Sequence, residues 1–147
     1  MTLSLVEKAR MLATLVHDGQ TDKAGRPYIL HPERVAKAVA HLGEECEAVG
    51  WLHDAQEAVT DAGWERGWFL GAMKHLGFPF GVREAVSVLT RREPAYLTHY
   101  IPSIKRSENP HVRPVKVADI KDNLRPGCPG SLRKRYERAL QILGEKP

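Results

Sequence analysis

Two histidines and two aspartates in this chain have the types and surroundings of metal ligands. His53 and Asp54 are adjacent, inside the segment LHDAQE at 52–57, while His31 lies upstream of them and Asp119 lies downstream. Two neutral imidazoles and two carboxylates form a mixed nitrogen and oxygen donor set that suits divalent first-row metals and leaves positions open for water and substrate. The four residues therefore predict one metal site, and the chemistry it favours is hydrolysis.

Glu57 is the residue best placed to act as a general base beside this site. It follows His53 by four residues and Asp54 by three, so on a single helix all three side chains would lie on neighbouring positions of one face. A carboxylate there could accept a proton from the attacking water.

The surroundings of Asp119 strengthen the prediction of a cation. A lone His or Asp on a helix is more often a surface residue or a packed polar group than a ligand. Asp119, however, follows the mostly apolar run VKVA at 115–118, where an unpaired carboxylate would lose much hydration free energy. A bound cation would remove that penalty, so the combination of residues favours a ligand role over the ordinary one.

Basic residues near these segments could clamp phosphate groups in the same site. For Lys116 and Lys121 the simpler interpretation is a solvated charge on a helix surface. The candidates nearest in sequence are Lys23, Arg26, Arg91, Lys116, Lys121 and Arg125.

The elements that must position these side chains are helices. Apolar residues recur at spacings of three and four along most of the chain, and no strand alternation of useful length occurs, so the sequence predicts an all-α protein with a bundle of about eight helices. A polar loop containing Gly25 and Pro27 separates the first two helices. The expected helices cover 3–17, 32–42, 44–59, 64–76, 81–89, 95–106, 111–124 and 132–143.

Size and composition fit one folded domain spanning residues 1–147. Hydrophobic residues make up 42% and charged residues 27%, which is ordinary for a globular protein and unlike a disordered one. The two cysteines, Cys46 and Cys128, are far apart in the sequence and form no CxxC pair, which favours a reducing, cytoplasmic setting. Neither a signal peptide nor an apolar run of roughly 20 residues is present, so we expect no membrane insertion.

Charge points to anionic partners. The net charge is +4 at pH 7, which favours nucleotides or other acidic ligands. A nucleic-acid-binding protein would more convincingly show a dense basic stripe with interleaved aromatic residues, and this sequence has none. We therefore expect a small phosphorylated substrate, with no nucleic acid or membrane partner.

The ordered set of motifs resembles the HD-domain phosphohydrolases, specifically the RelA/SpoT-like small alarmone hydrolases. The resemblance extends over most of the chain. It rests on the segments HDGQ at 17–20, KAGRPYILHP at 23–32, LHD at 52–54, LTR at 89–91, VKVAD at 115–119 and DN at 122–123.

This resemblance implies an all-helical fold that binds one Mn²⁺ ion and removes the 3′-pyrophosphate of guanosine tetra- or pentaphosphate or of an adenosine counterpart. The ligands would be the positions already singled out, namely His31, His53, Asp54 and Asp119. Glu57 would be the acidic partner of the attacking water. Substrate contacts would come from Lys23, Tyr28, Arg91, Asn123 and Tyr136.

Two positions depart from the family pattern. Ala58 stands where the alarmone hydrolases usually carry an Asp, and Asp61 could take over that catalytic role, as in the nucleotidase-like branch of HD enzymes. Asp22 stands where those hydrolases commonly carry a basic residue. Two alternatives therefore stay open: an HD-family nucleotide phosphohydrolase resembling 5′-nucleotidases, and a non-catalytic nucleotide-binding domain. The base preference and the oligomeric state are also left open.

Overall fold

Helices make up the regular structure of the chain. The computed structural model describes residues 2–92 and 94–145, except for the side chain of Arg66. Within this part of the chain the only β pairing is one isolated antiparallel bridge between Thr21 and Pro27. The elements, in chain order, are α1 (Leu5–Val16), α2 (Leu30–Val39), the 3₁₀-helix η1 (Ala40–Leu42), α3 (Glu44–Leu52), α4 (Ala55–Asp61), α5 (Arg66–His75), α6 (Phe80–Leu89), the π-helix η2 (Tyr96–Tyr100), α7 (Ile101–Arg106), α8 (Val112–Asn123) and α9 (Gly130–Ile142).

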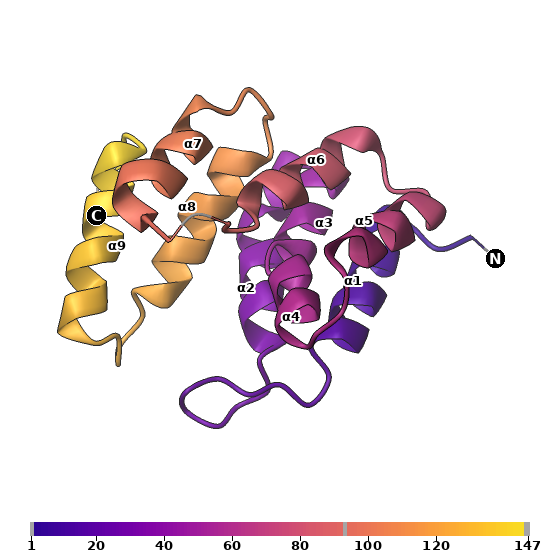
Figure 1. Ribbon diagram of the computed structural model, residues 1–147, viewed down its shortest axis with the longest axis horizontal. Helices are drawn as coiled ribbons and strands as arrows, with labels where there is room; N and C mark the ends of the chain where they lie inside the picture. The colour runs from indigo at the N-terminus through magenta and orange to yellow at the C-terminus, as the bar shows by residue number, and fades with distance from the viewer. Residues whose placement is uncertain (1, 93, 146–147) are drawn as a thin grey trace.

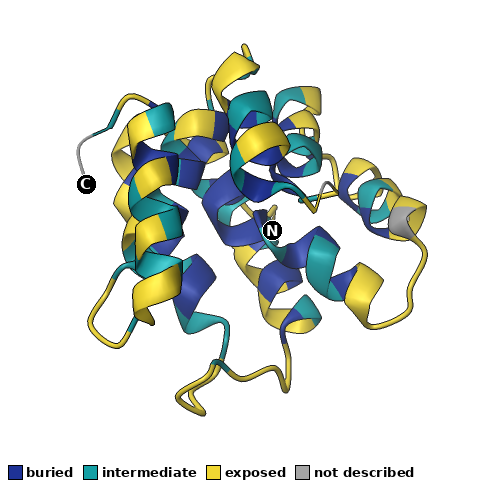
Figure 2. Ribbon diagram, turned by 60° about the vertical axis from the view of Figure 1, so that its left-hand side comes forward, coloured by how far each residue is buried: buried dark blue, intermediate teal, exposed yellow. Residues whose placement is uncertain are grey.

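The all-α prediction is confirmed, and each of the eight expected segments is helical. The helices form one bundle in which α2 packs against both α3 and α8, while α1 packs against α3 (Figure 1). Buried residues gather on the sides of the helices that face one another, and exposed residues on their outer sides (Figure 2). The loop between α1 and α2 extends from one end of the bundle (Figure 1). None of the helices formed by residues 2–92 and 94–145 has both the length and the apolar character needed to cross a bilayer.

The start of α1 illustrates how local sequence fixes a helix end. Ser4 accepts a hydrogen bond from the backbone N–H of Glu7 at 3.1 Å, and the Glu7 carboxylate accepts one from the backbone N–H of Ser4 at 2.7 Å. This reciprocal capping satisfies two donors that the first helical turn leaves unpaired. Ala9, Leu12 and Ala13 then form the buried face.

The helix expected over 44–59 is wrong in one respect, because the structure divides it into α3 and α4. His53 and Asp54 lie between the two helices. The ring Nδ1 of His53 lies 2.7 Å from the carbonyl oxygen of Gly50, the acceptor that the next backbone N–H would use if α3 continued. The side chain therefore ends the helix and turns its own ring toward the centre of the bundle.

The helix expected over 95–106 also differs from the prediction. Its first part is the π-helix η2, in which the backbone N–H of Tyr100 bonds to the carbonyl oxygen of Ala95 at 3.1 Å, and α7 follows. Pro102 lies in the first turn of α7, directly after the π-helix. Proline is thus accommodated by a change of helix type.

Close contact between α2 and α3 depends on Gly50. A Cβ atom added at Gly50 would lie 2.7 Å from the Cα of Ala36, a distance that real Cβ contacts do not show. The absence of a side chain lets the two backbones approach. This approach brings the end of α3, with His53, toward His31 on α2.

Candidate metal centre and adjoining pockets

The four expected ligands come together in space from three places in the fold. His31 lies on α2, His53 and Asp54 lie between α3 and α4, and Asp119 lies on α8. One ligand atom from each residue lies within 4.8 Å of the others. The imidazoles and Asp119 are buried, and Asp54 is partly buried. The cluster has a composition and size able to hold a metal ion.

Both imidazoles are oriented by a hydrogen bond on the ring nitrogen that faces away from the cluster. His31 Nδ1 lies 2.7 Å from Oδ2 of Asp122, and His53 Nδ1 lies 2.7 Å from the carbonyl oxygen of Gly50. Each Nε2 therefore faces the carboxylates. An outer partner of this kind fixes the tautomer of a metal-binding histidine.

His53 Nε2 gives a direct test of whether these residues fit a cation. This atom is buried and makes no hydrogen bond to any residue that the structure describes, although Oδ2 of Asp54 lies 3.2 Å away and Oδ1 of Asp119 lies 3.4 Å away. A buried polar atom without a partner is rare in folded proteins. A divalent ion among the three side chains would supply the missing partner, so the donor set fits one.

Without an ion, protons and ammonium groups balance the buried carboxylates. Burial opposes charge on His31, but its hydrogen bonds to Asp119 and Asp122 raise its pKa to about 9. Burial also opposes ionisation of Asp119, yet the nearby ammonium of Lys116 and the ring of His53 hold the pKa of this carboxyl well below its usual range. The site therefore favours positive charge at its centre.

Lys116 corrects one expectation from the sequence. It is buried, and its Nζ donates a hydrogen bond to Oδ2 of Asp119 at 2.8 Å. The same Nζ lies 4.8 Å from the centroid of the Tyr100 ring. The solvated helical charge expected here is wrong for Lys116, whereas Lys121 is exposed as expected. The apolar run around Lys116, three residues before Asp119, was the signal that pointed to burial.

Glu57 reaches the cluster from α4. It lines the same small pocket as Asp54 and Asp119, and its Oε1 accepts a hydrogen bond from the backbone N–H of Arg91 at 2.6 Å. Burial raises the pKa of the Glu57 carboxyl above its usual value. The structure therefore brings Glu57 to the cluster, although α4 is not continuous with the helix that precedes His53.

Asp61 is not brought to the cluster. It is the last residue of α4, it is exposed, and the lining of the small pocket does not include it. The substitute role considered for Asp61 required its carboxylate to reach the site. Its place at the far end of α4 argues against that role, and Ala58 supplies no carboxylate either.

Two pockets adjoin at the cluster. The smaller, here called the metal pocket, has a volume of about 250 Å³ and contains side chains of His31, Asp54, Glu57 and Asp119 in its wall. The larger, here called the outer pocket, has a volume of about 630 Å³. The two share four lining residues, namely Tyr28, His31, Asn123 and Tyr136.

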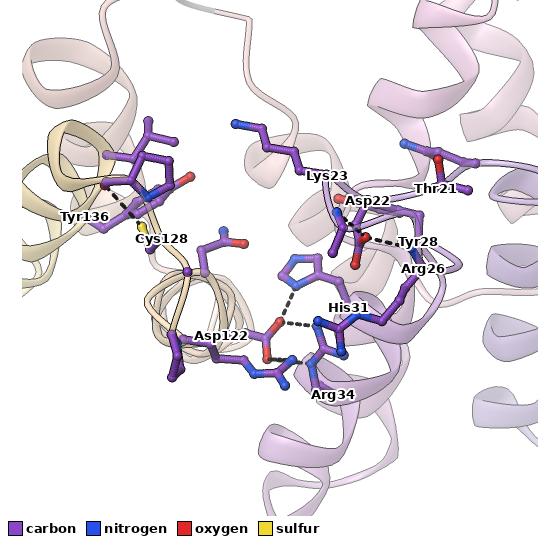
Figure 3. A pocket seen from close by; sticks show the side chains of 18 residues that line it. Thr21, Asp22, Lys23, Arg26, Tyr28, His31, Arg34, Asp122, Cys128 and Tyr136 are labelled. Atoms are coloured by element: carbon purple, nitrogen blue, oxygen red, sulfur yellow. Dashed lines mark hydrogen bonds and ion pairs between the residues drawn. The ribbon is translucent and has the colours of Figure 1, made fainter.

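The residues expected to contact substrate line these pockets. Lys23 lies on the loop before α2 and lines the outer pocket, with Tyr136 of α9 on the opposite side (Figure 3). Arg91 lines the metal pocket. Tyr28 and Asn123 also bond to ligand carboxylates: the Tyr28 hydroxyl donates to Oδ2 of Asp54, and Asn123 Nδ2 donates to Asp119 at 3.2 Å.

Several residues of this region were given no role by the sequence. Asp122 contacts His31 and also accepts a hydrogen bond from Arg34 Nε at 2.7 Å (Figure 3). Tyr96, Tyr100 and Arg135 line the metal pocket. Asp122 follows Asp119 by three residues on α8, and this helical spacing was the available signal for its position.

Comparison with known proteins gives relatives over part of the chain. No protein-family model matches it. The chain is 43% identical to a protein of Streptomyces antibioticus over 58 residues, 39% identical to one of Myxococcus xanthus over 57 residues, and 41% identical to one of Streptomyces coelicolor over 58 residues. These relatives are GTP pyrophosphokinases.

The similarity is limited in extent. The matched segment covers 37–38% of this chain and only 7–8% of the length of each of these three relatives. The homologues are enzymes of the RelA/SpoT family, which agrees with the family resemblance carried by the motifs. The names of these relatives refer to pyrophosphate transfer and give no evidence about hydrolysis.

Proposed function

We propose that this chain is a metal-dependent phosphohydrolase that removes the 3′-diphosphate of a purine alarmone, guanosine tetra- or pentaphosphate or an adenosine counterpart. The observation that carries the proposal is the cluster of His31, His53, Asp54 and Asp119, three of which line one pocket together with Glu57. A metal ion held by these ligands would activate a water molecule for attack on phosphorus, and the carboxylate base would accept the proton of that water.

Each group would have a distinct part in the reaction. A divalent ion held by His31, His53, Asp54 and Asp119, for which the family resemblance favours Mn²⁺, would supply Lewis-acid activation and neutralise phosphoryl charge. Glu57 would accept the proton of the attacking water. Because the pocket is partly buried, these charge interactions would be stronger there than in bulk water.

The outer pocket supports a substrate with anionic groups at two ends. Its wall contains four basic side chains, from Lys23, Arg26, Arg34 and Arg125. An ordinary nucleoside monophosphate would use basic groups near the metal alone. A nucleotide with phosphates on both sides of its ribose would use both pockets, with Asn123 and Tyr136 at their junction.

Ala58 favours one alternative, an HD-family nucleotide phosphohydrolase resembling 5′-nucleotidases. The alarmone hydrolases that this chain resembles usually carry a second carboxylate at that position. If one carboxylate is insufficient for any turnover, the chain would be a nucleotide-binding domain without catalysis.

Product analysis separates these possibilities. Metal-stripped protein is incubated with and without Mn²⁺ and offered guanosine tetraphosphate, its adenosine counterpart, and nucleoside mono- and triphosphates, and the products are resolved by anion exchange. We expect Mn²⁺-dependent release of inorganic diphosphate from an alarmone. Release only from ordinary nucleotides would favour the nucleotidase-like enzyme, and no turnover would favour a binding domain.

A matched pair of histidine variants controls this experiment. His53→Ala removes a proposed ligand and should abolish metal-dependent turnover. His75→Ala removes an exposed histidine near the end of α5 and should leave turnover unchanged.

A further inference from the structure

Three cations surround one tyrosine ring in the metal pocket. The centroid of the Tyr96 ring lies 4.5 Å from Arg135 Cζ, 5.2 Å from Arg91 Cζ and 5.7 Å from Lys116 Nζ. The cations come from separate parts of the chain: α9, the segment after α6, and α8. All four residues line the metal pocket. The pocket also contains the carboxylates of the metal cluster and of Glu57, so it is the immediate surroundings of Tyr96, where three cations meet, that favour an anion.

Two atoms of this group have unused hydrogen-bonding capacity. The Tyr96 hydroxyl oxygen and Arg135 Nε are both buried, and neither has a hydrogen-bond partner among residues 2–92 and 94–145. Leaving a buried polar group unpaired costs about 1–3 kcal/mol, so such groups usually have a ligand or an ordered water as partner. Both atoms can donate a hydrogen bond. The ligand that would satisfy them is an acceptor.

The position of Lys116 connects this group to the metal cluster. Its Nζ donates to Asp119 while lying over the rings of Tyr96 and Tyr100. An anion beside Tyr96 would therefore be adjacent to the proposed reaction centre. The pocket volume of about 250 Å³ corresponds to roughly eight water molecules at about 30 Å³ each, which gives room for two phosphoryl groups.

The π-helix explains why Tyr96 occupies this position. In η2 the rings of Tyr96 and Tyr100 lie 5.6 Å apart, and the Tyr100 hydroxyl donates to the carbonyl oxygen of Leu89 at 2.5 Å. Tyr100 is thereby fixed, whereas the Tyr96 hydroxyl has no such partner in the described part of the chain. Single π-helical turns are frequent at functional sites.

We propose that Tyr96, Arg135, Arg91 and Lys116 form a receptor for a terminal diphosphate, with the Tyr96 hydroxyl and Arg135 Nε donating to its oxygens. This inference rests on the proposed function, since the diphosphate is the group that the hydrolysis would release. Tyr96 and Arg135 are then specificity-determining residues. They favour substrates that end in two phosphoryl groups over substrates that end in one.

Calorimetric titration tests the receptor without requiring turnover. Inorganic diphosphate, and separately orthophosphate, is titrated into the full chain with stoichiometric Mn²⁺ and again with a chelator. We expect diphosphate to bind at least about tenfold more tightly than orthophosphate. Tyr96→Phe should weaken diphosphate binding at least about tenfold, the smallest effect expected from loss of a hydrogen bond to a charged group.

Two receptor variants and one control variant distinguish weaker diphosphate binding from loss of folding. Tyr96→Phe retains the ring that the cations contact, so its thermal unfolding midpoint should be unchanged or higher once an unpaired buried hydroxyl is removed. Arg135→Gln should also weaken diphosphate binding at least about tenfold. Lys134→Gln removes an exposed charge from the neighbouring position on α9 and serves as the matched control.

The outcomes for the receptor and for the proposed function are separable. Diphosphate binding that Tyr96→Phe weakens, in a chain without alarmone turnover, would support the receptor and overturn the hydrolase. Alarmone turnover combined with diphosphate binding that neither variant changes would overturn the receptor alone. Diphosphate binding that requires Mn²⁺ but is unchanged by Tyr96→Phe and by Arg135→Gln would also overturn the receptor, because the ion alone would then hold the diphosphate.

Discussion

His31 Nδ1 lies 2.7 Å from Oδ2 of Asp122, while His31 Nε2 lies 2.9 Å from Oδ1 of Asp119. One imidazole ring thus connects two carboxylates that are three residues apart on α8. Asp122 in turn accepts a hydrogen bond from Arg34, which anchors it on the side away from the cluster. The ring orientation needed for metal binding is set before any ion arrives.

Asp122→Asn should reduce metal affinity without removing a proposed ligand. The substitution weakens the acceptor that orients His31, and loss of such an outer partner typically lowers metal affinity by about 10–100-fold. The dissociation constant of Mn²⁺, measured by competition with a fluorescent chelator, checks this. Asp61→Asn, at the exposed end of α4, should leave the constant unchanged. Equal effects of the two substitutions would contradict the assigned role of Asp122.

The stability of the metal-free protein should fall as pH rises from 6.5 to 9. The pKa of His31 is raised from its ordinary 6.5 to about 9, so protonation stabilises the fold fully below pH 6.5, and this contribution is lost as pH rises through 9. We expect a decrease of about 2 kcal/mol in the free energy of unfolding, measured with urea in the presence of a chelator.

Mn²⁺ should reverse this pH dependence. Metal binding needs the neutral imidazole, so affinity, and with it the stability that the ion confers, should increase as pH rises over the same range. His31→Gln should remove part of the slope in the chelated protein; the rest comes from His53, where the carboxylates of Asp54 and Asp119 outweigh burial and also raise the pKa. A metal-free protein that becomes more stable toward pH 9 would contradict the assignment of the proton to His31.

Gly50→Ala should destabilise the fold. The added Cβ would lie 2.7 Å from the backbone of Ala36, and forced overpacking of this kind costs about 1–3 kcal/mol. Gly71→Ala is the matched control, because nothing lies within 4 Å of its added Cβ on α5. Replacing this helical glycine should stabilise the protein by about 0.5–1 kcal/mol. Urea denaturation measures the free energy of unfolding of both variants. If Gly50→Ala left this free energy unchanged, α2 and α3 would be able to move apart without cost, which would contradict the prediction.

Glu57→Gln should lower turnover while leaving metal binding intact. The amide keeps the size of the side chain but cannot accept a proton as a general base, a contribution typically of about 10²–10⁴-fold in rate. The rate constant under saturating alarmone and the Mn²⁺ dissociation constant are measured on the same preparation. A variant that turns over at the wild-type rate would assign the base to another group.

Local sequence was sufficient to predict which segments are helical and which residues form the candidate centre, although not where the helices over 44–59 and 95–106 are interrupted. Apolar spacing of three and four residues marks the helices because each one must bury a stripe of its own surface. Asp119 could be singled out because its apolar neighbours on the same helix place a carboxylate in the interior. The structure then brings it together with His31, His53 and Asp54.

Tertiary structure alone decided which of the basic and aromatic residues belong to the pockets. Lys116 and Lys121 both lie on α8, yet of the two only Lys116 places its Nζ over the rings of Tyr96 and Tyr100. The environment of a helical side chain depends on which other helix covers it, and that partner is distant in the chain. The receptor around Tyr96 likewise arises from packing between separate helices. The helices and the order of the expected ligands follow instead from short-range spacing, which the sequence by itself determines.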